Sequence, residues 1–377
     1  MKRVGAYFHH SSGRCVSVAA IALGLLFGLG PAFSISGRAE ATSLRIEASG
    51  ATLDWNAVAH AGGRIFVSGP RWTGFSGPSV AVLEPGNRLR PFPDQAWNGW
   101  KPGLDARRYF VNVNALHVDS EGQLWVVDTG TPRFGGPPVA GGAKLVRLDT
   151  RTGKIIRVYP LVENVAPVGS YIDDIRFNGA HAYLTDAGTG ALLVLDLASG
   201  ACRRVLAGHP AVMARVDRPI VMGGRILRDD KGQPLRINVD PLEVSPDGKT
   251  LYFGPLEGPW SQVPTAALDD AALPPDRLAA QVTFWADLPP IGGSTMDRKG
   301  RLYFTALKDD TVYRREPDGR ILALLHDPRL HWADAPILAG DGRLWLPVAQ
   351  LDRLPQFNKG KSKTWLPFLL VSIQPAP

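Results

Sequence analysis

One strand pattern recurs six times along this chain, and a repeat of this kind decides the architecture before any single motif does. Its clearest copy spans residues 114–159 as four short runs of β-branched and aromatic residues, with turns at Gly122 and Gly153. Four such runs in succession predict a four-stranded antiparallel meander. The second run of each copy carries an aromatic residue at one position, and successive copies are 42 to 69 residues apart: Phe66, Trp125, Tyr183, Tyr252, Tyr303 and Trp345. We therefore predict an all-β fold, a six-bladed β-propeller with four-stranded antiparallel blades around a central channel.

No linker interrupts the repeat, and single blades cannot bury their faces alone, so residues 42–377 are expected to form one domain. Residues 44–48 and 368–373 are spare strands at the two ends of the repeat, and their pairing would close the ring and remove its edges. Two Pro-rich stretches, residues 220–235 and 254–276, are predicted to be inserted loops that form a lid over one face.

The first 41 residues have the pattern of a signal peptide. Cations at Lys2 and Arg3 precede an apolar run over residues 16–29, and residues 39–41 offer an A-x-A cleavage site. The run is shorter than the roughly 20 residues that span a bilayer, so we expect a secreted or periplasmic protein with no stable membrane span after cleavage. An uncleaved N-terminal anchor is the alternative.

Charge and cysteine content exclude several classes of protein. Loss of residues 1–41 would remove four cations and one acid, which lowers the formal net charge from +7 to +4. The remaining cations are scattered singly, so no nucleic-acid partner is expected. Cys202 would be the one cysteine left, so the mature chain has neither an internal disulfide nor a C-x-x-C site. Motifs of serine hydrolases, P-loop proteins and Rossmann folds are absent, and the oligomeric state stays open.

Several stretches follow one another in a distinctive order. They are Pro70-Arg71-Trp72, residues 122–130 (GQLWVVDTG), 182–186 (AYLTD), 251–256 (LYFGPL) and Trp332-Ala333-Asp334. In this order they resemble the major royal jelly protein and Yellow family, over residues 55–370. The resemblance implies a secreted six-bladed propeller, similar to bacterial relatives described as dopachrome-tautomerase-like. It implies no shared set of catalytic residues.

A ring of polar residues is predicted at one mouth of the channel. Alignment of the six copies places these residues at the start of the innermost strands: Asn56, Asn114, Asp173, Asp240, Gly292 and Asp334. Innermost strands line the channel of a propeller, so residues at one register converge at one depth, with Asp174 beside them. We predict that Asn56, Asn114, Asp173, Asp174, Asp240 and Asp334 form a ligand-binding ring. The alternative is that these Asn and Asp residues cap loops where the chain enters a strand.

Carboxylates brought together in this way repel one another unless a cation or shared protons intervene. Asp173, Asp240 and Asp334 are therefore candidate ligands for Ca²⁺ or another divalent cation, which prefers oxygen donors. The histidines show no paired spacing, so zinc is not expected, and no other cofactor is indicated. Trp72, Trp97, Trp100, Trp260 and Trp332 fall in predicted loops, and most of them are expected to cover the core or its edges. The alternative for one or two of them is an aromatic surface for a ligand in the channel.

Three functions remain open. The first is an exported Yellow-like propeller that binds a small aromatic or amine-bearing molecule in its channel, with rearrangement of that molecule undecided. The second is a metal-dependent lactonase similar to the gluconolactonase propellers, in which a ring of acids holds a divalent cation. Asn56 and Gly292 stand where that class has acidic residues, which counts against it in its usual form. The third is a non-catalytic scaffold that presents its loops to a protein partner.

Overall fold

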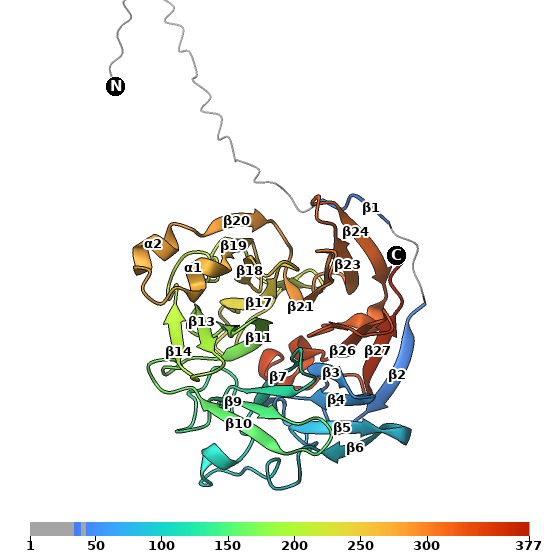
Figure 1. The fold of residues 1–377 in the computed structure, drawn as a ribbon. Helices are drawn as coiled ribbons and strands as arrows, with labels where there is room; N and C mark the ends of the chain where they lie inside the picture. The colour runs from blue at the N-terminus through green and yellow to red at the C-terminus, as the bar shows by residue number, and fades with distance from the viewer. Residues whose placement is uncertain (1–33, 39–42, 377) are drawn as a thin grey trace, which may run out of the picture. The chain divides into compact units, whose positions relative to one another are not determined.

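The computed structural model describes residues 34–38 and 43–376, which form six larger sheets arranged in a ring and one two-stranded hairpin (Figure 1). Five sheets have four consecutive antiparallel strands in the order of the chain. Innermost strands of neighbouring sheets contact one another around the ring, and the sixth sheet returns to the first. The predicted six-bladed β-propeller is therefore confirmed.

All six runs that defined the repeat are the second strands of blades. Blade one consists of β3 (Ala57–Ala61), β4 (Arg64–Ser68), β5 (Val80–Glu84) and β6 (Arg88–Pro91), and blade two of β7 (Val113–Val118), β8 (Leu124–Asp128), β9 (Lys144–Leu148) and β10 (Ile155–Pro160). Blade three consists of β11 (Ile172–Asn178), β12 (His181–Asp186), β13 (Ala191–Asp196) and β14 (Cys202–Val205), and blade four of β17 (Val239–Val244), β18 (Thr250–Pro255), β19 (Trp260–Pro264) and β20 (Thr283–Ala286). Blade five consists of β21 (Ile291–Met296), β22 (Leu302–Ala306), β23 (Thr311–Arg315) and β24 (Ile321–His326).

Both ends of the described chain complete the sixth blade. Its strands are β25 (Ile337–Leu338), β26 (Leu344–Val348), β27 (Phe368–Ile373) and, from the other end of the domain, β2 (Arg45–Gly50). Strand β2 pairs antiparallel with β27, with Arg45 opposite Ser372. The predicted ring closure is thus confirmed, and it hides edges that would otherwise be open for pairing.

The core lies between adjacent blades. Strand residues alternate between the two faces of each blade, so every sheet buries one set against its predecessor and one against its successor. Between blades two and three, for example, Trp125 stacks on Tyr159 with ring centroids 5.1 Å apart and also contacts Phe177. A large core of this kind suits a domain in which Cys202 is a free cysteine.

The predicted signal peptide lies largely outside the described residues, and its cleavage stays a prediction. Within residues 34–38, Gly37 and Arg38 form a short strand, β1, which pairs parallel with β24 at the outer edge of blade five. Among the described helices, none is long and apolar enough to span a bilayer.

One of the two predicted lid segments covers the channel. Residues 220–235 contain the short hairpin of β15 (Val221–Met222) and β16 (Arg225–Ile226), and residues 229–237 face a cavity at the channel mouth. The prediction for residues 254–276 is wrong: they form the end of β18, all of β19, helix α1 (Thr265–Asp269) and the start of α2 (Pro275–Ala279). Pro255 and Pro264 end strands, where a missing N–H group is tolerated.

Candidate functional site at the channel mouth

Four innermost strands have an irregularity at the same place. The register of β7, β11, β17 and β21 against their partners shifts within their first residues, which leaves one or two residues of each strand unpaired. These unpaired residues include Asn114, Asp173, Asp240 and Gly292. A β-bulge turns a side chain away from the regular alternation, and here the repeated bulge turns the ring residues toward the channel.

The six aligned positions meet around one cavity of about 710 Å³. Its lining includes Asn56, Asn114, Asp173, Asp240, Gly292 and Asp334. The residue before each position is a buried hydrophobic, which anchors the strand entry: Trp55, Val113, Ile172, Val239, Ile291 and Ala333. Alignment of the six strand repeats therefore located a real cavity.

Gly292 leaves a gap in the ring because a side chain has no room at that position. A Cβ atom there would lie 2.3 Å from the carbonyl oxygen of Ala333 and 3.1 Å from Oγ1 of Thr305. Thr305 donates a hydrogen bond of 2.6 Å to the same carbonyl. The entry to the sixth blade thus passes directly over the fifth ring position, and only backbone can occupy it.

A chain of hydrogen bonds fixes the orientation of the ring amide. Trp72 Nε1 donates to the hydroxyl oxygen of Tyr171 (2.9 Å), and this hydroxyl donates to Oδ1 of Asn114 (2.7 Å). The amide nitrogen of Asn114 must then face Asp173, whose Oδ1 accepts a hydrogen bond of 2.8 Å. Each donor leaves its neighbour one orientation, so the chain from Trp72 to Asp173 runs in a single direction.

Electrostatic repulsion acts on all three ring carboxyls. Burial raises the pKa of Asp173 well above the ordinary value, and the charge of Asp240 raises it further. Burial also raises the pKa of Asp240 well above the ordinary value, and the charge of Asp334 adds to this. Burial also raises the pKa of Asp334 to about 7, although the Ala335 N–H and Trp332 Nε1 donate to its oxygens. Without a cation, the ring therefore keeps protons near neutral pH.

Two further acids lie near the ring and were missed by the sequence interpretation. Asp54 is fully buried, neither of its carboxyl oxygens has a hydrogen-bond partner among the described residues, and burial raises its pKa well above the ordinary value. Burial likewise raises the pKa of Glu257 to about 7. Asp54 could have been suspected because it lies two residues before Asn56, whereas Glu257 has no repeat position that marks it.

Asp174 does not line this cavity. Its Oδ2 accepts a hydrogen bond of 2.7 Å from Arg176, whose guanidinium also binds both carboxylate oxygens of Glu243. Arg176 donates further to the carbonyl of Ser294, so one cation ties the inner strands of blades three, four and five together. Asp174 belongs to this network below the ring, rather than to the ring itself.

Aromatic residues form the wall of the cavity. Phe134 lies between Trp72 and Phe357, with ring centroids 4.9 Å and 5.5 Å away, and Tyr171 and Trp332 complete the lining. Of the tryptophans predicted in loops, Trp72 and Trp332 thus reach the cavity, while Trp260 lies in β19 and is fully buried. Tyr171 and Trp332 share a signal that sequence interpretation overlooked, since each precedes a ring aspartate by two residues.

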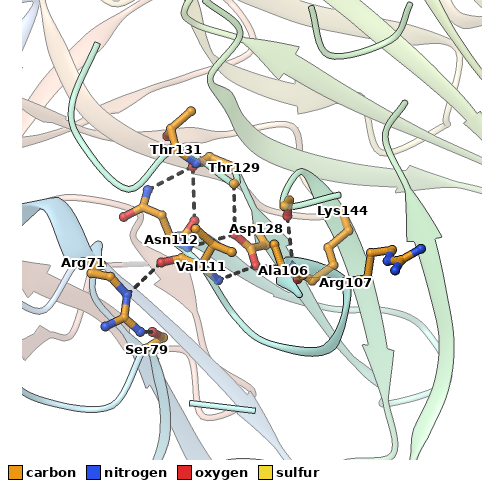
Figure 2. Close-up of polar contacts among 12 residues, drawn as sticks. Arg71, Ser79, Ala106, Arg107, Val111, Asn112, Asp128, Thr129, Thr131 and Lys144 are labelled. Carbon is orange, nitrogen blue, oxygen red and sulfur yellow. Dashed lines mark hydrogen bonds and ion pairs between the residues drawn. The ribbon is translucent and has the colours of Figure 1, made fainter. Parts of the chain in front are cut away.

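A buried ion pair between Asp128 and Lys144 fixes the backbone just ahead of β7 (Figure 2). Asp128, the last residue of β8, accepts hydrogen bonds from the backbone N–H groups of Val111 and Asn112, just ahead of β7, and from Lys144 Nζ at 2.7 Å. Arg71 donates to the carbonyl of Val111 (2.9 Å), which holds the neighbouring Trp72 over the cavity. Both distinctive motifs, Pro70-Arg71-Trp72 and residues 122–130, therefore position the site without lining it with a charged group.

The predicted metal ligands do not form a compact cluster. Across residues 34–38 and 43–376, no three His, Cys, Asp or Glu side chains lie close enough together to hold one metal ion. Asp173, Asp240 and Asp334 offer the oxygen donors that Ca²⁺ prefers. A shared ion would require these side chains to move toward one another.

Fold and site together define a class: a six-bladed propeller with an acid-lined, aromatic-walled cavity at one end of its channel. The family profile of the major royal jelly proteins matches residues 111–323, which run from blade two into the last strand of blade five. This chain belongs to the major royal jelly protein family. No curated protein sequence matches it.

Solved structures share the fold at low sequence identity. A gluconolactonase from Xanthomonas campestris is 15% identical, with 89% of this chain and 90% of that chain covered and a TM-score of 0.52. A calcium-binding regucalcin from Agrobacterium tumefaciens is 14% identical, with 90% and 97% covered and a TM-score of 0.51. A luciferin-regenerating enzyme is 11% identical, with 89% and 95% covered and a TM-score of 0.52. At these identities the likeness extends to the fold alone.

Proposed function

We propose that this protein is exported and binds a small molecule with an aromatic ring and a protonated amine in the cavity at the channel mouth. The observation that carries the proposal is the combination of ring carboxyls and an aromatic wall within one cavity of about 710 Å³. That volume is typical of small-molecule sites. Phe134 and Trp72 would stack on the ligand ring, while Asp173, Asp240 and Asp334 would face its ammonium group.

The electrostatics of the ring favour a cationic ligand. An ammonium group stabilises ionised carboxylates, so its binding would displace protons that the ring otherwise keeps. A neutral ligand of the same shape would leave the acids protonated and would gain no ion pair. The carboxyls need not gather around one point, because an ammonium group can be satisfied by one carboxylate and a neighbouring ring face.

Calorimetry with tyramine and with 4-ethylphenol, which lacks the ammonium group, tests this proposal. We expect tyramine to bind about tenfold more tightly at pH 8 than at pH 6, because Asp334, whose pKa burial raises to about 7, ionises over this interval, and to release protons. Asp240→Asn should remove much of this preference, whereas Asp318→Asn, on the exposed β23–β24 turn away from the cavity, should leave it unchanged. Equal affinity for the two probes, or tyramine binding unaffected by Asp240→Asn, would overturn the proposal.

A calcium-dependent lactonase is the second candidate, favoured by the three carboxyls of raised pKa on one cavity. In this case the ion, once bound, would act as a Lewis acid on the lactone carbonyl. The test is thermal stability with and without Ca²⁺, together with hydrolysis of glucono-δ-lactone. A protein indifferent to Ca²⁺ and inactive on the lactone would exclude this candidate. Product analysis after incubation with tyramine separates binding from rearrangement.

A further inference from the structure

The loop between β26 and β27 presents an apolar tip flanked by cations. Trp365 and Leu366 are 65% and 55% exposed, although both are large hydrophobic residues. Lys359, Lys361 and Lys363 precede them, all exposed and without an ion pair or side-chain hydrogen bond among the described residues. No acidic residue follows Asp352 in the sequence, so nothing in this segment neutralises the lysines.

The exposed indole is held in place by its neighbours. Gln350, which is buried, accepts a hydrogen bond from the backbone N–H of Trp365 (3.0 Å) through Oε1 and donates to the backbone carbonyl of Trp365 (2.9 Å) through Nε2. The Arg353 guanidinium lies 3.8 Å from the centre of the indole ring and also donates to Gln350 (2.8 Å). A flexible loop tip would need none of these contacts. The buried Gln350 amide and the stacked Arg353 cation therefore hold Trp365 in an exposed position.

Neighbouring loops place this tip on the face that carries the cavity mouth. Leu351 and Phe357, earlier in the same loop, line the cavity and pack against Leu227 and Leu235 of the lid segment. Arg225, Ile226 and Arg228 lie beside these residues on the lid, and Ile226 is 41% exposed. A second element of the same face thus also combines cations with an exposed hydrophobic residue.

We propose that this face docks on an anionic phospholipid surface through Lys359, Lys361, Lys363, Trp365 and Leu366. Tryptophan is favoured at the boundary between headgroups and acyl chains, and lysines near an anionic bilayer are attracted to its phosphates. Other occupants fit less well. The charged residues before residue 34 are all cations, Lys2, Arg3 and Arg14, so that segment would be repelled by the lysines of the loop. A second copy of this face would bring the same positive charge and would be repelled for the same reason. Docking would turn the cavity mouth toward the lipid.

Sedimentation with vesicles tests the proposal on the whole mature chain. We expect binding to phosphatidylcholine vesicles that contain one quarter phosphatidylglycerol, loss of binding in high salt, and little binding to pure phosphatidylcholine. Changing Lys359, Lys361 and Lys363 together to Ser should weaken binding about a hundredfold, at about fivefold per lysine. Trp365→Ser should weaken it at least fivefold, with an unchanged melting temperature as evidence of folding.

A matched triple variant controls for net charge. Arg151, Lys249 and Lys299, exposed on turns at the opposite ends of the blades, are changed together to Ser and should leave vesicle binding intact. Quenching of Trp365 fluorescence by brominated lipid, lost in Trp365→Phe, would place the indole in the bilayer. Three results would overturn the proposal: no binding to anionic vesicles, equal loss in the control variant, or equally tight binding to soluble polyglutamate that ignores Trp365→Ser, which would indicate an acidic polymer partner.

Discussion

His331 should make the stability of this propeller depend on pH in a window separate from that of the ring acids. The imidazole lies between two carboxylates: Nδ1 is 3.0 Å from Asp310 Oδ1, and Nε2 is 2.9 Å from Asp352 Oδ1. Both nitrogens can donate only when the ring is a cation. Asp310 belongs to the β22–β23 turn and Asp352 to the β26–β27 loop, so the protonated ring joins blade five to the loop that lines the cavity. Arg353 also lies near both acids.

The magnitude follows from the pKa. Although burial alone would lower it, the hydrogen bonds and charges of Asp310 and Asp352 raise the pKa of His331 from 6.5 to about 9. This difference corresponds to about 3 kcal/mol of folding free energy. Below pH 6.5 the histidine is charged in both the folded and the unfolded chain, so the contribution is fully present. It falls as pH rises from about 6.5 and is lost above about 9.

Urea unfolding of wild type and His331→Gln at pH 6, 7.5 and 9.5 measures this contribution. The ring carboxyls also titrate. Because the pKa of Asp334 is raised to about 7 in the folded protein, its contribution to stability is lost as pH rises from about 4 to about 7. This loss occurs in both proteins, so it cancels in the difference between them. We expect the free energy of unfolding of the wild type to exceed that of the variant by up to about 3 kcal/mol at pH 6 and by much less at pH 9.5. His326→Gln, an exposed histidine without an ion pair among the described residues, serves as control. A difference in the free energy of unfolding that stays constant from pH 6 to 9.5 would refute the stabilising role of protonated His331.

Three other predictions concern the site and its support. Tyr171→Phe removes the hydroxyl between Trp72 Nε1 and Asn114 Oδ1, so the amide loses its fixed orientation, and tyramine affinity should fall about tenfold at a cost of about 1 kcal/mol in urea unfolding. Lys144→Met strands the buried Asp128 carboxylate and should destabilise the fold by about 3 to 5 kcal/mol, with much of this recovered by adding Asp128→Asn. Gly292→Ala forces a Cβ against a carbonyl oxygen and should cost about 2 kcal/mol or more, which calorimetric melting detects.

The strand repeat predicted both the architecture and the position of the cavity, for a physical reason. In a propeller one register of six innermost strands converges on one depth, so aligning the copies brought Asn114, Asp173 and Asp240 together without any knowledge of the loops. The same alignment marked Gly292 as an exception, but its cause, the carbonyl of Ala333, lies in another blade and leaves no trace in the local sequence.

Loop conformation accounts for what the sequence interpretation missed. Phe134 and Phe357 reach the cavity from loops after β8 and β26, and their approach to Trp72 depends on packing between segments far apart in the chain. Prolines misled the interpretation of residues 254–276, because Pro255 and Pro264 mark strand ends there. Local composition cannot distinguish a proline that ends a strand from one that interrupts a loop.

The motif residues and the loop residues have different roles around the cavity. The motifs typical of the family position the cavity, whereas much of its aromatic lining comes from loops outside them. Arg71 and Asp128, from the two most distinctive motifs, bind backbone groups of residues 111 and 112 and so determine where Trp72 and the ring stand. Phe134 and Phe357 lie outside those motifs, in loops that can change without disturbing these backbone contacts. A relative with the same motifs and different loops would keep Trp72 and Trp332 in the wall and lose Phe134 and Phe357 from it. On the proposed function, we expect residues 131–143 and 349–367 to set ligand preference, so exchanging these loops between relatives should transfer that preference while leaving the propeller intact.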